Sequence, residues 1–116
     1  MDKEKKKKLL EEYKNRKPDK GIISIKNKTE GKEFLTIAKD KKADINSMKM
    51  KLKSNWHPNK ELQELWNKYG EGDFQIDLIE QLKYDDLQED YSNELEELLE
   101  IILLEKENAK RLEKKK

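Results

Sequence analysis

The chain contains no cysteine, only four glycines and two prolines, and aromatic residues make up 7% of its 116 residues. The lack of cysteine excludes disulfide bonds and thiolate metal sites, and it is compatible with a reducing compartment. No apolar run approaches the roughly 20 residues that a membrane-spanning helix needs, and the basic start "MDKEKKKKLLEEYKNRKP" lacks the apolar core of an export signal. We therefore expect a cytoplasmic protein of bacterial type with no membrane partner.

Charge dominates what is present: 46% of the residues are charged and only 33% are hydrophobic, yet the net charge is +1. The apolar residues are clustered, so we expect one small ordered domain with solvated ends rather than a disordered chain. Residues 1–20 hold nine bases and five acids, whereas residues 85–116 hold six bases and eleven acids. These basic and acidic ends are either solvated helix faces, partners of each other, or contacts for different partners.

The first part of the chain reads as a helix followed by a hairpin. Asp2 is a suitable cap for a helix that runs to about Arg16, and Pro18 ends it because the residue before proline avoids helical dihedrals. An isoleucine-rich stretch, Gly21–Lys26, predicts a strand, and Glu33–Lys39 predicts a second one after the turn "NKTEGK".

Two helices and a third strand are expected next. The stretch "SMKMKLKS" fits both strand and helix spacing, and we favour a helix over 42–54 because Met, Lys and Leu are good helix formers. Pro58 begins a further helix that runs to about Tyr69, with Gly70 as its C-terminal cap. The alternation in "DFQIDLIEQL" then predicts a half-buried strand.

A final apolar stripe predicts a helix over 85–112 that packs on the sheet rather than forming a dimer seam, so a monomer is favoured. The predicted fold is therefore α+β: a small three-stranded antiparallel sheet flanked by helices, in the order α-ββ-αα-β-α. Residues 1–20 are expected to be a basic helix and linker, 21–104 the domain proper, and 105–116 a charged tail that frays.

Two triplets and a downstream block carry a resemblance to a known family. Gly21-Ile22-Ile23 is followed, after ten residues, by Phe34-Leu35-Thr36, and the block "MKMKLKSNWHPNKELQELWNKYGEGDF" comes later. From residue 21 to residue 82 this pattern resembles the GIY-YIG nuclease superfamily. The positions of the block in register are Leu52, His57, Asn59, Leu62, Gln63, Trp66, Lys68, Tyr69, Gly70 and Phe74.

The resemblance implies a catalytic site from which this sequence departs. In the family two tyrosines, an arginine and a metal-binding glutamate surround the scissile phosphate. The tyrosine positions are Ile23 and Phe34 here, the arginine position is Asp44, and a histidine position on the same helix is Met48. An anion in place of the arginine repels phosphate, and loss of such a clamp alone costs about 10²–10³ in rate.

The metal-binding glutamate is not fixed by the sequence. Glu89, Glu94 and Glu97 are candidates, but glutamates are expected by chance in so acidic a segment. We therefore predict no catalytic residues, no metal site and no cofactor. Mg²⁺ or Mn²⁺ would be required only if the domain were an active nuclease.

A lysine-rich region borders the implied site and suggests contact with a nucleic-acid backbone. His57, the only histidine, is either a general base, a phosphate contact or a loop residue that holds the next helix. Trp56 is a stacking candidate, whereas Trp66 and Tyr69 are expected in the core. The predicted nucleic-acid-binding residues are Lys39, Lys41, Lys42, Lys49, Lys51, Lys53, Trp56 and His57.

The favoured function is a catalytically inactive GIY-YIG-like domain that binds nucleic acid or protein. One alternative is an active metal-dependent endonuclease with a rearranged site, in which Arg16 or Arg111 supplies the missing positive charge. Another is a protein-interaction module that uses the acidic C-terminal helix.

Overall fold

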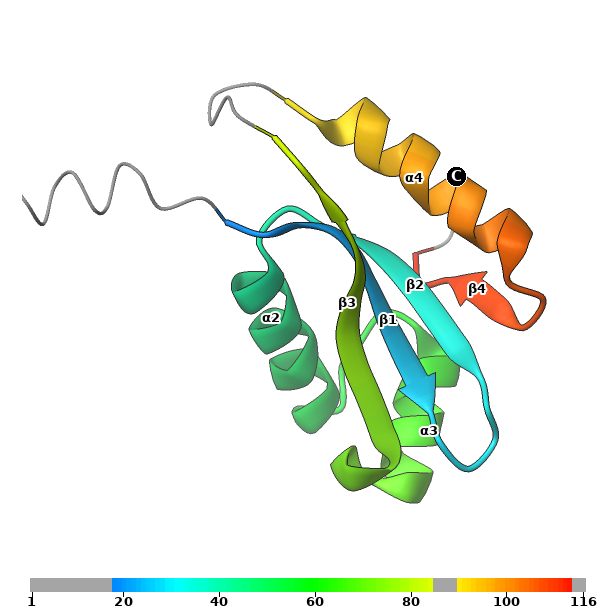
Figure 1. The fold of residues 1–116 in the computed structure, drawn as a ribbon. Helices are drawn as coiled ribbons and strands as arrows, with labels where there is room; N and C mark the ends of the chain where they lie inside the picture. The colour runs from blue at the N-terminus through cyan, green and yellow to red at the C-terminus, as the bar shows by residue number, and fades with distance from the viewer. Residues whose placement is uncertain (1–17, 85–89, 114–116) are drawn as a thin grey trace, which may run out of the picture.

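The computed structural model describes residues 18–84 and 90–113. It contains a four-stranded sheet in the order β3-β1-β2-β4 and helices on both faces of that sheet (Figure 1). None of the helices in these residues is long and apolar enough to cross a membrane. In chain order the elements are β1 (Lys20–Asn27), β2 (Glu33–Ala38), α2 (Lys41–Lys53), α3 (Lys60–Tyr69), the 3₁₀ helix η1 (Glu71–Asp73), β3 (Phe74–Leu82), α4 (Ser92–Glu105) and β4 (Ala109–Arg111).

The central strand β1 is buried on both faces. It pairs antiparallel with β2 on one side and with β3 on the other. Ile22 faces α4, while Ile23 and Ile25 face α2 and α3, and all three side chains are fully buried. A strand covered on both faces reads as a continuous apolar run rather than an alternating one, which is the pattern of "GIISI".

Two apolar cores lie on opposite faces of the sheet. The larger core joins β1 and β2 to α2 and α3 through residues such as Phe34, Leu52 and Trp66. The smaller core joins Ile22 and Leu35 of the sheet to residues of α4. Because α4 closes the second face, the hairpin is stabilised from both sides, as a two-stranded hairpin alone would not be.

The region with ambiguous spacing is helical. Met48 and Leu52 are buried on one side of α2, whereas Met50 is exposed, as helix spacing requires. Asp40 caps this helix by accepting a hydrogen bond from the amide of Ala43. The predicted helices 42–54 and Pro58–Tyr69 and the three predicted strands are thus confirmed within a few residues.

The sheet and the end of the chain differ from the prediction. The sheet is mixed and four-stranded, not three-stranded and antiparallel, because β4 pairs parallel to β2. The last helix does not continue to Leu112 but ends at Glu105. Leu112 is instead buried in the larger core, and its amide donates to the carbonyl of Leu35 at 2.8 Å. The part of the expected frayed tail that reaches to Glu113 is therefore packed on the domain.

The expected helix over residues 2–16 lies outside the described residues, as do residues 85–89 and 114–116. The proposed division of the chain at residues 20 and 104 therefore stays a prediction.

The glycine of the first triplet has a structural role. A Cβ atom on Gly21 would lie 1.8 Å from the carbonyl oxygen of Glu80 and 2.9 Å from the Cα of Gln81. This close approach occurs beside the register shift between β1 and β3 at Ile22 and Ile23. Only a residue without a side chain allows the two strands to pair there.

We predict that Gly21→Ala lowers the free energy of unfolding by about 3 kcal/mol, because β3 must move to admit the methyl group. Urea denaturation measures this change. Gly72→Ala is the matched control, since a Cβ there meets no atom within 4 Å. Equal stability of the two variants would show that the close approach does not constrain the sheet.

Candidate functional site

A groove of about 660 Å³ lies between the loop that precedes α3 and the strand β4. A cavity of about 140 Å³ shares Lys51, His57 and Glu113 with this groove and reaches Asp44 on α2. Of the positions that the resemblance implies as catalytic, Phe34 lines the groove and Asp44 and Met48 line the cavity, whereas Ile23 lines neither. The groove is lined by Phe34, Lys51, His57, Pro58, Asn59, Lys60, Glu61, Lys110, Arg111, Leu112 and Glu113.

The two tyrosine positions belong to the hydrophobic core. Ile23 is fully buried and Phe34 is 1% exposed. Met48, at the histidine position, is also buried in that core, so none of the three offers a polar group. Thr36 does present a hydroxyl, but it donates to a carboxylate oxygen of Glu113 at 2.7 Å.

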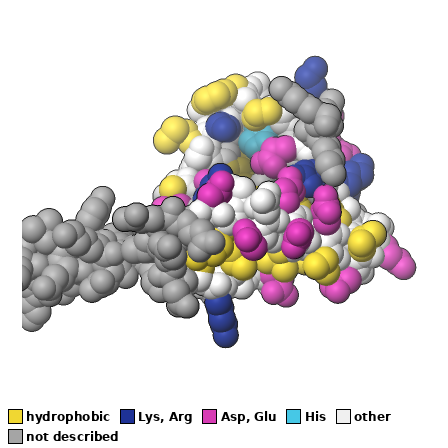
Figure 2. Space-filling view, turned by 90° about the horizontal axis from the view of Figure 1, so that it is seen from above, with side chains coloured by type: hydrophobic (Ala, Val, Ile, Leu, Met, Phe, Trp, Pro, Cys, Tyr) yellow, Lys and Arg dark blue, Asp and Glu magenta, His cyan; other side chains and the backbone are white. Residues whose placement is uncertain are grey.

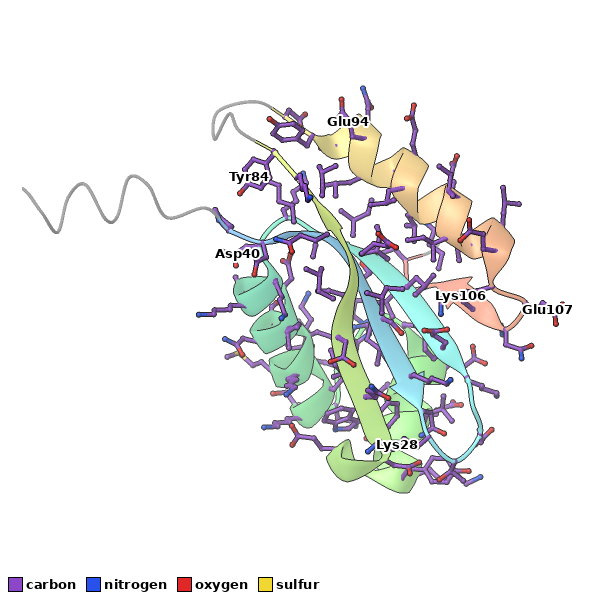
Figure 3. The ribbon with its side chains drawn as sticks, viewed as in Figure 1. Lys28, Asp40, Tyr84, Glu94, Lys106 and Glu107 are labelled. Atoms are coloured by element: carbon purple, nitrogen blue, oxygen red, sulfur yellow. The ribbon has the colours of Figure 1, made fainter. Side chains whose placement is uncertain are left out.

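Asp44, at the arginine position, has a structural partner on the backbone. Its carboxylate accepts hydrogen bonds from the amides of Lys39 at 2.9 Å and Asp40 at 3.1 Å. These amides precede the first turn of α2, where the helix dipole also favours a negative charge. Figure 3 labels Asp40 at this end of the helix. The aspartate thus holds the β2–α2 connection.

Acidic side chains from three elements meet at this end of the molecule. Asp44, Glu96 and Glu113 line one open cavity of about 330 Å³. Each has a protein partner: Glu96 binds Arg111 in an ion pair, and Glu113 accepts from Thr36. Neither Glu96 nor Glu113 was among the sequence candidates, and no local signal distinguishes them, since only the path of β4 brings them together.

The glutamates predicted from the sequence lie elsewhere. Glu94 and Glu97 are on α4, and Glu94 lies at the end of the helix remote from β4 (Figure 3). Glu89 lies outside the described residues. No group of three or more His, Cys, Asp or Glu side chains in the described part is placed to hold a metal ion. The absence of a metal site therefore stays a prediction, because the resemblance implies a single glutamate and not a cluster, and we derive no step through a metal.

The predicted lysines occupy two sides of α2 rather than one patch. Lys42, Lys49 and Lys53 recur at seven and four residues and so lie along one side. Lys49 and Lys53 each form an ion pair with Glu71, at 3.7 and 3.6 Å. Of the other predicted lysines, Lys51 lines the groove, Lys39 lines the acidic cavity and Lys41 begins the helix.

Three further cations line the groove, two of which form ion pairs. Lys110 binds Glu61 at 3.3 Å, and Arg111 binds Glu96. Lys60 and Lys51 form no ion pair within residues 18–84 and 90–113. The groove thus combines four basic and two acidic side chains. Lys60 and Lys110 were not among the predicted binding residues, whereas Arg111 was named as a residue that could supply positive charge.

His57 is fixed at the centre of this region by the start of α3. Its Nδ1 accepts a hydrogen bond from the amide of Asn59 at 3.0 Å, and its own amide donates to the side chain of Gln63. Burial lowers the pKa of His57, and the positive charge of Lys51 lowers it further. Figure 2 shows this single histidine in a hollow with acidic side chains close by. The neighbouring Trp56 is 60% exposed.

The lowered pKa of His57 predicts a loss of stability in mild acid. The unfolded state takes up a proton near pH 6.5, before the folded state does, so the free energy of unfolding falls as the pH drops below about 6.5. The limiting slope for one proton is about 1.4 kcal/mol per pH unit. Denaturant unfolding between pH 7.5 and pH 5 measures this slope.

His57→Asn is the control for that titration, because its side-chain oxygen can still accept from a backbone amide without taking up a proton. We expect a flatter profile over the same range. The carboxyl groups of Glu30, Asp73 and Asp90, whose pKa is lowered in the fold, also lose stabilisation as the pH falls, but chiefly below about pH 5, because the unfolded groups titrate near pH 4. An unchanged profile in the variant would assign the slope to other groups.

The fold is similar to that of a known nuclease domain. No protein-family model and no curated protein matches the sequence. One similar solved structure is the catalytic domain of the homing endonuclease I-TevI, with 23% sequence identity and a TM-score of 0.65; the match covers 82% of this chain and 99% of that one. A second is a mutant form of the same catalytic domain, with 24% identity and a TM-score of 0.63; the match covers 75% of this chain and 82% of that one. The chain therefore has a GIY-YIG-like fold.

Proposed function

We propose that this domain binds nucleic acid and does not cleave it. The observation that carries the proposal is the state of the three implied catalytic positions. Ile23 and Phe34 are core residues, and Asp44 is committed to backbone amides. The groove and the fold of a nuclease domain remain, and with them a surface suited to a phosphate backbone.

The missing groups are those that phosphodiester cleavage requires. A water molecule must lose a proton to a base, and the developing negative charge on the phosphate must be stabilised. Ile23 and Phe34 provide no hydroxyl, and the carboxylate of Asp44 adds repulsion where the family has an arginine. His57 could accept a proton, but Arg111 is paired with Glu96, and Lys51 in the cavity of Asp44 lacks the bidentate donors of an arginine.

Binding, in contrast, requires only cations along a groove. Lys51, Lys60 and Lys110 line it together with Arg111, against two acidic side chains, so its formal charge is +2 with His57 neutral. Phosphate contacts of this kind are independent of sequence and weaken steeply with salt. The acidic cavity at Asp44 and Glu96 repels phosphate, so the nucleic-acid backbone would follow the part of the groove that Lys60 and Lys110 line.

We predict that Lys51→Ala with Lys60→Ala weakens binding to duplex DNA about tenfold and reduces the salt slope by about two phosphate contacts. Fluorescence anisotropy over a series of salt concentrations measures both quantities. Lys26→Ala with Lys83→Ala is the matched control, because it removes the same charge from positions outside the groove. Equal losses in the two double variants would place the contact elsewhere, for example along Lys42 and Lys53.

We also predict that the protein does not nick supercoiled plasmid in Mg²⁺ or Mn²⁺, because Ile23 and Phe34 offer no hydroxyl and Asp44 is an anion bound to backbone amides. Gel analysis after overnight incubation, with a preparation mock-purified in parallel as the blank, measures this. Metal-dependent nicking that survives further purification would refute the proposal that the domain does not cleave nucleic acid. Failure to bind DNA or RNA at low salt would instead leave the protein-interaction function.

One observation favours the alternative of an active nuclease with a rearranged site. Arg111 reaches the groove from β4, although Glu96 neutralises it. Glu96→Gln separates the two functions. If the domain only binds, the substitution releases Arg111, and we expect DNA affinity to rise several-fold without nicking, since one salt bridge no longer competes with phosphate. If Glu96 were a catalytic group, the same substitution would abolish nicking shown by the natural chain.

A further inference from the structure

The outward face of α4 is both acidic and apolar. Glu94, Glu97, Ile101 and Leu104 recur at three- and four-residue spacing, so they share one side of the helix. Ile101 is 53% and Leu104 88% exposed. The opposite side of α4 is already used, since it carries the residues buried against the sheet. Figure 2, which looks down on this part of the molecule, shows a band of hydrophobic side chains bordered by acidic ones.

Two exposed aliphatic side chains among carboxylates suit a partner that is apolar and basic. A second copy of α4 does not meet this requirement, because an antiparallel pair would set the glutamates of one copy against the apolar residues of the other. Burying an unpaired carboxylate against Ile101 or Leu104 is costly. The charge of the face therefore selects a basic amphipathic helix as its occupant.

The chain itself contains a segment of this chemistry in residues 1–17. Eight bases and four acids give this segment a net charge of +4, and Leu9, Leu10 and Tyr13 are its apolar residues. The spacing of Leu9 and Tyr13 places them on one face of the helix that the sequence predicts there. The lysine run over residues 5–8 and the cations at 14, 16 and 17 flank these apolar residues.

The described chain begins next to the start of α4. The hydroxyl of Tyr84 donates to the carbonyl of Pro18, and the ring of Tyr84 lies 5.2 Å from that of Tyr91, the residue that precedes α4. Figure 3 labels Tyr84 at this junction. The segment that ends at residue 17 is therefore tethered beside one end of the acidic face.

The lengths also agree. The 14 residues of α4 span about 21 Å, and a helix of similar length within residues 2–16 would cover the same face when it runs antiparallel to α4. Tethering raises the effective concentration of the segment at the face far above that of a free partner. We propose that residues 1–17 bind the outward face of α4 in the same molecule, with the side of the segment that carries Leu9 and Tyr13 turned toward α4.

Because the chain has no cysteine, one introduced cysteine can be labelled uniquely. A nitroxide on the full chain carrying Glu4→Cys is expected to broaden the backbone amide signals of residues 101–105 in NMR spectra. The broadening should weaken in high salt, which screens the charge contacts. Signals of the distant strand β3 near Phe74 serve as the internal reference.

Two variants of the labelled chain test the apolar contact. Leu104→Ser, a change at an exposed position that removes the apolar contact without adding charge, should weaken the broadening. Met50→Ser is the matched control, because Met50 is 66% exposed on α2 and lies outside the proposed contact. Equal effects of the two variants would refute the contact with Leu104.

A mixed sample distinguishes contact within one molecule from contact between two copies. It combines a chain that carries the nitroxide but no ¹⁵N with a chain that carries ¹⁵N but no nitroxide. Broadening confined to the chain that carries both labels supports binding within one molecule. Broadening in the mixture would assign the face to a second copy, and no selective broadening in either sample would refute the proposal altogether.

Discussion

The structure depends on one constraint: the central strand β1 is buried on both of its faces. Every side chain from Ile22 to Ile25 must satisfy a packed environment, and Gly21 must admit the backbone of β3. A tyrosine at the position of Ile23 would have to bring its hydroxyl to a partner or bury it unpaired, at about 1–3 kcal/mol. Isoleucine removes that requirement. The fully buried Ile23 therefore fits the demands of packing at this position.

Asp44 likewise has a structural role. The resemblance implies an arginine that serves the substrate at this position, whereas here the carboxylate accepts hydrogen bonds from two amides at the start of α2. Capping interactions of this kind contribute about 1 kcal/mol each, a sizeable share of the stability of so small a domain. The reversed charge is therefore not an unexplained defect in a site. It is a residue with its own structural role, which would resist return to arginine.

Residue type and periodicity were sufficient for the existence of the longer elements. The spacing in α2 fitted a strand as well as a helix, and the helix propensity of Met, Lys and Leu decided between them. The isoleucines of β1 predicted a strand, but not that both of its faces are covered. The three residues of β4, Ala-Lys-Arg, show no alternation, and their strand conformation follows from pairing with β2 and from burial of Leu112. Glu96 and Glu113 were missed for the same reason, since the non-local path of β4 brings Glu113 to the cavity that Glu96 and Asp44 line.

The short strand β4 consequently links the groove to the helix α4. Its Arg111 binds Glu96 on the inner side of α4, so the charge available in the groove depends on where α4 sits against the sheet. The same helix presents Ile101 and Leu104 on its outer side. An occupant of that outer face would stabilise α4 in place and so favour the ion pair that neutralises Arg111. Binding at the two surfaces would then be coupled, and by linkage nucleic acid that competes for Arg111 would weaken the occupant in return.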